Sequence, residues 1–181
     1  MFSNPRAVID AVGVHQGMIV ADFGAGEGTY ARELAERVGD TGIVYAFDVQ
    51  KDLVARLAAY ARDAHITALR PVWVDLELPR STGLLDDSID TAFVVNTLFQ
   101  IEDKESFLGE VFRVLRLNGR VLIIDWSDTE RVVGPHPDHI LSAALTRSIA
   151  EKVGLVFDST RDAGAHQYGL LFRKKRSVSM I

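Results

Sequence analysis

Residues 18–28 read MIVADFGAGEG and join an apolar run to a helical pattern through a glycine-rich loop. The run at 18–21 is bounded by Gly17 and by the later glycines, which is typical of a strand buried on both faces of a parallel sheet. Glycine permits a positive φ and leaves no Cβ in the way of a ligand. The start of the following helix adds free N–H groups and the positive end of a dipole. The stretch therefore predicts a ligand site where the first strand ends.

The spacing of the glycines indicates which ligand to expect. A dinucleotide-binding loop of the form G-x-G-x-x-G, counted from Gly24, would need glycine at position 29, where the chain has Thr29. The pattern D-x-G-x-G-x-G instead resembles motif I of the class I S-adenosylmethionine-dependent methyltransferases. The resemblance implies that the loop wraps the methionine part of S-adenosyl-L-methionine, with Asp22 near its amino group; the alternative is a glycine-rich turn without a ligand. The implied cofactor-binding residues of the loop are Asp22, Gly24, Ala25, Gly26 and Gly28.

A carboxylate ends the second predicted strand. Residues 43–47 are apolar and lead into Asp48, about 20 residues past the last glycine of the loop. An acid at this place can accept both hydroxyls of a ribose, and the position favours that role for Asp48, with Val49 beside it. The alternative role is that of N-cap of the next helix, and the two roles are compatible in the local turn.

The third predicted strand, residues 68–74, is closed by Asp75 and Leu76. The resemblance implies that Asp75 accepts a hydrogen bond from the adenine amino group and that the backbone N–H of Leu76 meets a ring nitrogen. The alternative is that Asp75 is an ordinary loop acid.

The fourth predicted strand, residues 87–95, ends in Asn96. The resemblance implies that Asn96 lies beside the cofactor, with carbonyl groups of this region toward the methionine amino group. Phe99 and Gln100 are then candidates for the substrate cavity. Family members often carry histidine near this point, and its absence here removes one candidate base.

Two later stretches extend the resemblance over nearly the whole chain. Residues 110–120, EVFRVLRLNGR, look like the family's helix, turn and fifth strand, the strand being expected at 120–125. Residues 155–160 and 166–173 read as a terminal hairpin, and HQYGLLFR resembles the last strand of small members akin to quinone-biosynthesis methyltransferases. The resemblance implies a single α/β domain over 1–181. Its Rossmann-like sheet would have seven strands in the order 3-2-1-4-5-7-6, the last strand antiparallel, with helices on both faces.

Composition narrows the function further. The chain has 181 residues, 48% of them hydrophobic, and a net charge of −5, which speaks against a nucleic-acid partner. It has no cysteine, which excludes disulfides and thiolate chemistry. Neither a signal peptide nor an apolar stretch approaching the ~20 residues of a membrane span is visible, so we expect a cytoplasmic protein. His136 and His139 are a weak metal signal, and we expect surface residues and no metal site.

These features predict an S-adenosylmethionine-dependent methyltransferase that acts on a small molecule. One alternative is an NAD(P)-dependent oxidoreductase, against which Thr29 and the terminal hairpin argue; another is a protein that binds the cofactor without catalysis. Whether a second subunit of a homodimer completes the cavity is left open by the sequence. No catalytic base is identified: Asp125 could point at the methyl centre or be a polar strand end. The aromatic candidates for a substrate pocket, which could equally belong to the core, are Tyr30, Phe99, Trp126 and Tyr168.

Overall fold

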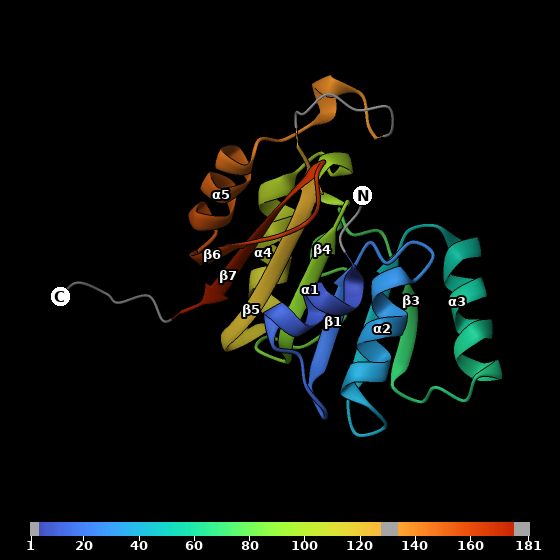
Figure 1. The fold of residues 1–181 in the computed structure, drawn as a ribbon. Coiled ribbons are helices and arrows are strands. Elements are labelled where there is room, and N and C mark those ends of the chain that lie inside the picture. The colour runs from blue at the N-terminus through green and yellow to red at the C-terminus, as the bar shows by residue number, and fades with distance from the viewer. Residues whose placement is uncertain (1–3, 128–133, 176–181) are drawn as a thin grey trace.

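A twisted sheet runs through the middle of the computed structural model, which describes residues 4–127 and 134–175 (Figure 1). Its seven strands follow the order β3-β2-β1-β4-β5-β7-β6, which confirms the predicted order. Strands β1 to β5 are parallel, and β7 lies between β5 and β6 and is antiparallel to both. The strands are β1 (Ile19–Phe23), β2 (Ile43–Asp48), β3 (Leu69–Trp73), β4 (Ile89–Val95), β5 (Leu115–Trp126), β6 (Leu155–Arg161) and β7 (Gln167–Lys174).

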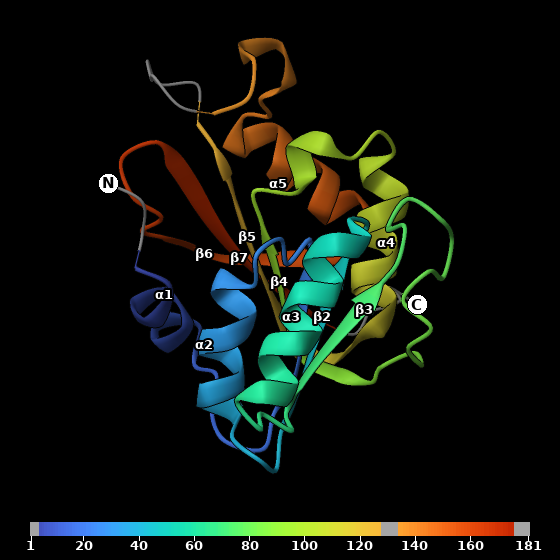
Figure 2. The ribbon, with the colours of Figure 1, turned by 90° about the vertical axis from the view of Figure 1, so that its right-hand side faces the viewer.

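Helices cover both faces of the sheet, as predicted (Figures 1 and 2). Side chains of α1, α2 and α3 share one core cluster with alternate residues of the central strands, and side chains of α4 and α5 share a second cluster with the remaining ones. Val20 belongs to the first cluster and Ala21 to the second, because successive side chains of a strand point to opposite faces. The helices are α1 (Pro5–Val12), α2 (Thr29–Val38), α3 (Lys51–Asp63), α4 (Lys104–Val114) and α5 (Ala143–Lys152), with short 3₁₀ turns η1 (Leu98–Gln100) and η2 (Pro137–His139).

The register of the parallel strands brings their carboxyl ends together. Phe23 of β1 pairs with Phe47 of β2 and with Val94 of β4. The residues that end or follow these strands, among them Asp48 and Asn96, therefore meet at one edge of the sheet. Such an edge, where the strand order reverses beside β1, is where open α/β sheets bind ligands.

The expected start of the fifth strand at residue 120 is wrong. Strand β5 begins at Leu115, directly after α4, and Leu115 pairs with Ile89 of β4. The pairing shifts before Arg120 meets Thr91, and Asn118 in between has a φ of 64°. The Asn-Gly turn seen in the sequence is thus an irregularity within the strand rather than its boundary. Among the described residues, no helix is long and apolar enough to cross a membrane.

Candidate functional site

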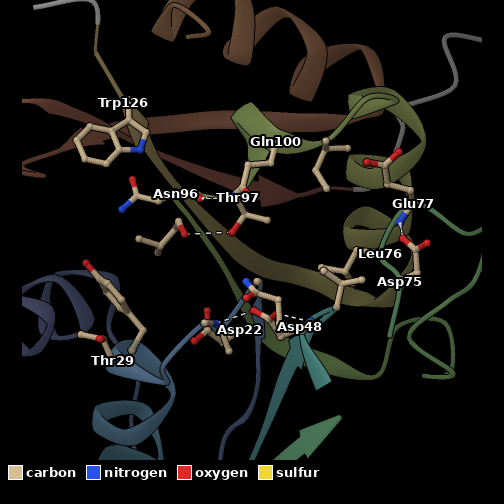
Figure 3. Close-up of a pocket in the computed structure, with 18 of the residues that line it drawn as sticks. Asp22, Thr29, Asp48, Asp75, Leu76, Glu77, Asn96, Thr97, Gln100 and Trp126 are labelled. Atoms are coloured by element: carbon tan, nitrogen blue, oxygen red, sulfur yellow. Dashed lines mark hydrogen bonds between the residues drawn. The ribbon is translucent and has the colours of Figure 1, made fainter. Parts of the chain in front are cut away.

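A cavity of about 850 Å³ opens at the carboxyl edge of the sheet (Figure 3). Its volume lies within the range of about 300–1,000 Å³ that is usual for small-molecule sites. Segments that follow β1, β2, β3 and β4 form most of its wall, joined by the end of β5 and the start of β7. The lining residues are Pro5, Asp22, Gly24, Ala25, Gly26, Thr29, Tyr30, Asp48, Val49, Gln50, Asp75, Leu76, Glu77, Val95, Asn96, Thr97, Gln100, Ile101, Trp126 and Gln167.

The three predicted glycines of the loop have different surroundings. A Cβ on Gly24 would lie 2.2 Å from Oγ1 of Thr97, and the φ of Gly24 is +82°. Gly26 also has a positive φ, +55°, but a Cβ there would meet nothing within 4 Å. Gly28 does not line the cavity, and its Cβ would lie 2.4 Å from Leu57 of α3. Only Gly24 and Gly26 therefore bring bare backbone to the cavity, whereas Gly28 allows the start of α2 to pack against α3.

Hydrogen bonds from the tip of β2 fix the glycine loop. The N–H groups of Gly24 and Ala25 both donate to the carbonyl of Phe47, at 2.9 Å each. The N–H of Gly26 donates to Oδ2 of Asp48 at 2.7 Å. Three successive N–H groups of the loop thus have partners within the protein.

The other carboxylate oxygen of Asp48 accepts a hydrogen bond from the turn that directly follows β2. Oδ1 accepts a hydrogen bond from the N–H of Gln50 at 2.8 Å. The N-cap residue of α3 is Gln50, so the alternative that Asp48 is the N-cap of this helix is wrong. Asp48 is buried yet lines the cavity beside Asp22, as Figure 3 shows.

Asp22 is the most unusual charged group of the cavity. Its side chain is 2% exposed, and its Oδ2 atom is buried without a hydrogen-bond partner. Burial, and secondly the negative charge of Asp48, raise the pKa of Asp22 to about 7, against a smaller opposing effect of a backbone hydrogen bond at Ala31. A carboxylate with one unpartnered oxygen in this position favours a bound cation, because a positive charge would replace the solvation that Asp22 has lost.

The third acid, Asp75, lies farther along the edge of the sheet, beside Leu76 and Glu77 (Figure 3). Its Oδ1 accepts a hydrogen bond from the N–H of Glu77 at 3.0 Å. Val49 also lines the cavity, and its carbonyl accepts a hydrogen bond from Nε1 of Trp73, the last residue of β3, at 2.9 Å. The structure therefore brings the predicted residues that follow β2 and β3 together.

Asn96 follows β4 with a left-handed φ of 53° and is held at three atoms. Its N–H donates to the carbonyl of Ile124 at 2.8 Å, and its carbonyl accepts from Nε2 of Gln100 at 3.1 Å. Its side-chain Oδ1 accepts from Nε2 of Gln167. Gln167 was not predicted as a site residue, because only the pairing of β7 with β5, in which it faces Trp126, places it here.

The side chain of Asp125 bonds to backbone groups around the end of β5 and does not line the cavity. It is 1% exposed, is not a lining residue, and accepts hydrogen bonds from the N–H of Trp126 at 2.8 Å and of Phe99 at 2.9 Å. Burial raises its pKa to about 6, although both hydrogen bonds and the charge of Lys104 act in the opposite direction. Its contact with the start of η1 supports the polar strand-end interpretation.

The aromatic and histidine candidates separate into two groups. Tyr30 and Trp126 line the cavity, whereas Phe99 and Tyr168 do not. His136 and His139 lie in and beside η2 and are exposed, with ring centroids 6.4 Å apart. Within residues 4–127 and 134–175, no group of three or more potential metal-ligating side chains is found.

Comparison with known proteins agrees with this geometry. Residues 14–157 match the family model described as a methyltransferase domain. The structure is similar to that of a SAM-dependent methyltransferase from Aquifex aeolicus, with a TM-score of 0.86 and 28% sequence identity over 96% of this chain and 90% of that one. It shares its fold, at 21% identity and a TM-score of 0.78, with a putative type 11 methyltransferase from Sulfolobus solfataricus, over 100% of this chain and 98% of that one.

Among curated relatives, the ubiquinone/menaquinone biosynthesis C-methyltransferase UbiE of Idiomarina loihiensis is 33% identical over 124 residues, which are 67% of this chain and 48% of that protein. An uncharacterized 37.1 kDa protein in transposon TN4556 of Streptomyces fradiae is 31% identical over 151 residues, 83% of this chain and 42% of that protein. The chain thus spans about half the length of these relatives.

Proposed function

We propose that this chain, which belongs to the methyltransferase domain family, binds S-adenosyl-L-methionine in the cavity at the carboxyl edge of the sheet and transfers its methyl group to a small molecule. The observation that carries the proposal is the buried carboxylate of Asp22, whose Oδ2 has no partner although it belongs to the cavity wall. The cofactor carries an ammonium and a sulfonium, and either cation would be attracted by the neighbouring carboxylates of Asp22 and Asp48. The name of the UbiE relative supports a small-molecule acceptor.

The methionine part of the cofactor fits the side of the glycine loop. The ammonium would take the place opposite Oδ2 of Asp22, and the bare backbone at Gly24 and Gly26 would let the ligand approach closely. Ala25 and Asn96 complete this part of the wall. Gly28 would act indirectly, by letting α2 begin against α3.

The nucleoside part fits the tips of β2 and β3. An ionised carboxylate has about four lone-pair sites, and Asp48 uses one on each oxygen for backbone N–H groups. The remaining site on each oxygen can accept one ribose hydroxyl. Asp75 and the N–H of Leu76 would bind the adenine edge, with Val49 along the ring.

The same geometry argues against a nicotinamide dinucleotide. A pyrophosphate needs free N–H groups at the glycine loop or a cationic side chain. Here the N–H groups of Gly24, Ala25 and Gly26 already have partners, and every charged side chain that lines the described cavity is an acid. Two negative phosphates would face Asp22 and Asp48.

Methyl transfer in this cavity rests on positioning. When bound, the cofactor supplies an electrophilic methyl group on a sulfonium. The chain's own residues would hold the acceptor in line with that group and exclude water, which is catalysis by proximity and orientation. No histidine, lysine or cysteine is found among the lining residues of the described chain, so carboxylates and Tyr30 are the titratable groups that line the described cavity.

The lack of histidine, lysine and cysteine among the described lining residues favours one second candidate, a protein that binds the cofactor without turning it over. Calorimetric titration with S-adenosylhomocysteine and with NAD⁺ tests the binding proposal, and formation of S-adenosylhomocysteine from S-adenosylmethionine across an acceptor panel tests the reaction. We expect binding of the sulfur nucleoside and turnover with some acceptor. Binding of NAD⁺ alone would overturn the proposal, and binding without turnover across the panel would favour the second candidate.

A further inference from the structure

Three amide side chains from separate parts of the chain meet in one wall of the cavity. Asn96 follows β4, Gln100 ends η1 and Gln167 begins β7, and all three line the cavity. We call these three residues the amide cluster. In Figure 3, Asn96 and Gln100 lie with Trp126 on the side of the cavity away from Asp22 and Asp48. The amide cluster therefore lies apart from the two acids to which we assign the ammonium and the ribose, and Asn96 is the member that we also place beside the methionine part of the cofactor.

Hydrogen bonds within the amide cluster fix which atoms are left for a ligand. Gln167 donates its Nε2 to Oδ1 of Asn96, and Gln100 donates its Nε2 to the carbonyl of Asn96 at 3.1 Å. The N–H of Asn96 is held by the carbonyl of Ile124 at 2.8 Å, so its backbone is fixed as well. Because a side-chain amide is planar, fixing one end sets the direction of the other. What remains for a ligand is the Nδ2 group of Asn96, the second N–H of each glutamine Nε2, and two acceptors, the Oε1 atoms of Gln100 and Gln167.

N–H donors beside two amide oxygens suit a group that can both accept and donate a hydrogen bond. A hydroxyl or a neutral amine does both, whereas a carboxylate only accepts and would leave the two amide oxygens without a donor. The charges around the cavity act in the same sense. The lining side chains that carry charge are Asp22, Asp48, Asp75 and Glu77, so the local field disfavours an anionic acceptor.

We infer that the amide cluster is the acceptor site and that it selects an uncharged molecule bearing a hydroxyl or neutral amine. Trp126, which lies on this side of the cavity in Figure 3, would cover the apolar body of such a molecule. The inference rests on the proposed function, because it takes the acid-lined part of the cavity as the cofactor site. It adds the charge and hydrogen-bonding class of the acceptor and the residues that choose it.

Matched fragments test this selection without relying on turnover. The protein is first saturated with S-adenosylhomocysteine and then titrated, with ligand-detected NMR, against pairs in which a carboxamide replaces a carboxylate. Suitable pairs are 4-hydroxybenzamide with 4-hydroxybenzoate and 4-aminobenzamide with 4-aminobenzoate, within a larger library of hydroxyl-bearing and amine-bearing fragments built in the same way. We expect the neutral members to bind, and the carboxylates to bind at least about tenfold more weakly.

Variants locate the effect. Gln167→Leu and Gln100→Leu should each weaken binding of the neutral members by about five- to tenfold, the scale of one hydrogen bond, and leave S-adenosylhomocysteine affinity within about twofold. Gln100→Lys should reverse the preference by adding a cation, so that the carboxylate members bind better than the neutral ones. Gln16→Leu makes the same change as the first two at an exposed position outside the cavity and should alter neither ligand.

The outcomes separate this inference from the proposed function. If wild-type protein fails to bind S-adenosylhomocysteine, the proposed function itself fails. If that ligand binds but the carboxylates bind as well as the amides, or no neutral fragment binds, or the glutamine variants bind like wild type, the acceptor inference alone is overturned.

Discussion

The ionisation of Asp22 should make the ligand-free protein less stable as the pH rises. Burial and the charge of Asp48 raise the pKa of Asp22 from 3.8 to about 7. Since a difference of one pKa unit between the folded and unfolded states corresponds to about 1.4 kcal/mol, the shift amounts to about 4 kcal/mol. The folded state binds this proton more tightly than the unfolded state does. The stabilisation is therefore fully present below about pH 4 and is lost as the pH rises through about 7.

Replacing Asp22 by asparagine removes the titration and keeps the size of the side chain. Urea denaturation of both proteins between pH 4.5 and 8 gives the free energy of unfolding of each. We expect the value of the wild type to fall relative to Asp22→Asn by about 3 kcal/mol across this range, because part of the full effect lies below pH 4.5. Asp125, whose pKa burial raises to about 6, titrates in both proteins, so the difference between them isolates Asp22. A difference that stays constant with pH would refute the reasoning.

Cofactor binding should depend on pH in the opposite direction. A ligand ammonium at Oδ2 of Asp22 requires the ionised carboxylate, so the affinity for S-adenosylhomocysteine should rise up to about tenfold per unit toward pH 7 and then level off. Calorimetry at pH 6 in two buffers of different ionisation enthalpy should show release of nearly one proton on binding. Asp22→Asn should bind more weakly and with little pH dependence. An affinity for the wild type that is flat from pH 5.5 to 7.5, without proton release, would contradict a cation at this carboxylate.

Further substitutions test the loop and its neighbours. Gly24→Ala should lower the free energy of unfolding by about 2–4 kcal/mol, measured by urea denaturation, because of its positive φ and the contact with Thr97. Gly26→Ala should lower the free energy of unfolding by only about 1 kcal/mol, from its positive φ alone, but bind S-adenosylhomocysteine at least about tenfold more weakly, since its Cβ would point into open space; equal effects of the two changes on stability would contradict this. Asp48→Ala should weaken that binding by about 1–3 kcal/mol in calorimetry, and an unchanged affinity would remove its proposed ribose role. Asp125→Asn should keep the affinity within about twofold while lowering stability by about 1–2 kcal/mol, and a large loss of turnover with unchanged stability would reinstate it as a catalytic candidate.

The order of the strands was predictable because it is written in local patterns. Each apolar run with its closing polar residue marks one strand, and the resemblance to a family supplies the order in which such strands pair. The start of β5 was not predictable in this way. An Asn-Gly pair normally ends an element, but here Leu115 already pairs with Ile89 and the turn is contained within the strand.

Within the site, the sequence identified the residues that stand directly after an apolar run, because such residues lie at the carboxyl ends of the parallel strands. Asp22, Asp48 and Asp75 each follow a predicted strand, and they meet because the carboxyl ends of parallel strands share one edge. Gly28 belongs to the same motif, but only the position of Leu57 on another helix shows that it faces away from the cavity. Spacing along one segment does not reveal such contacts.

The acceptor side was harder to predict, because long-range pairing forms it. Gln167 lies 71 residues from Asn96 and reaches it only because β7 inserts between β5 and β6. Asp125 shows the converse. A carboxylate at a strand end next to the site is a reasonable catalytic candidate by position, yet two backbone N–H groups turn it away from the cavity.

A crystal structure of the protein with S-adenosylhomocysteine tests the central claim most directly. We predict density in the cavity at the carboxyl edge of the sheet, with the amino group of the ligand about 3 Å from Oδ2 of Asp22 and both ribose hydroxyls on Asp48. A ligand that lies elsewhere, or one that occupies this cavity with its carboxylate rather than its amino group against Asp22, would contradict the account.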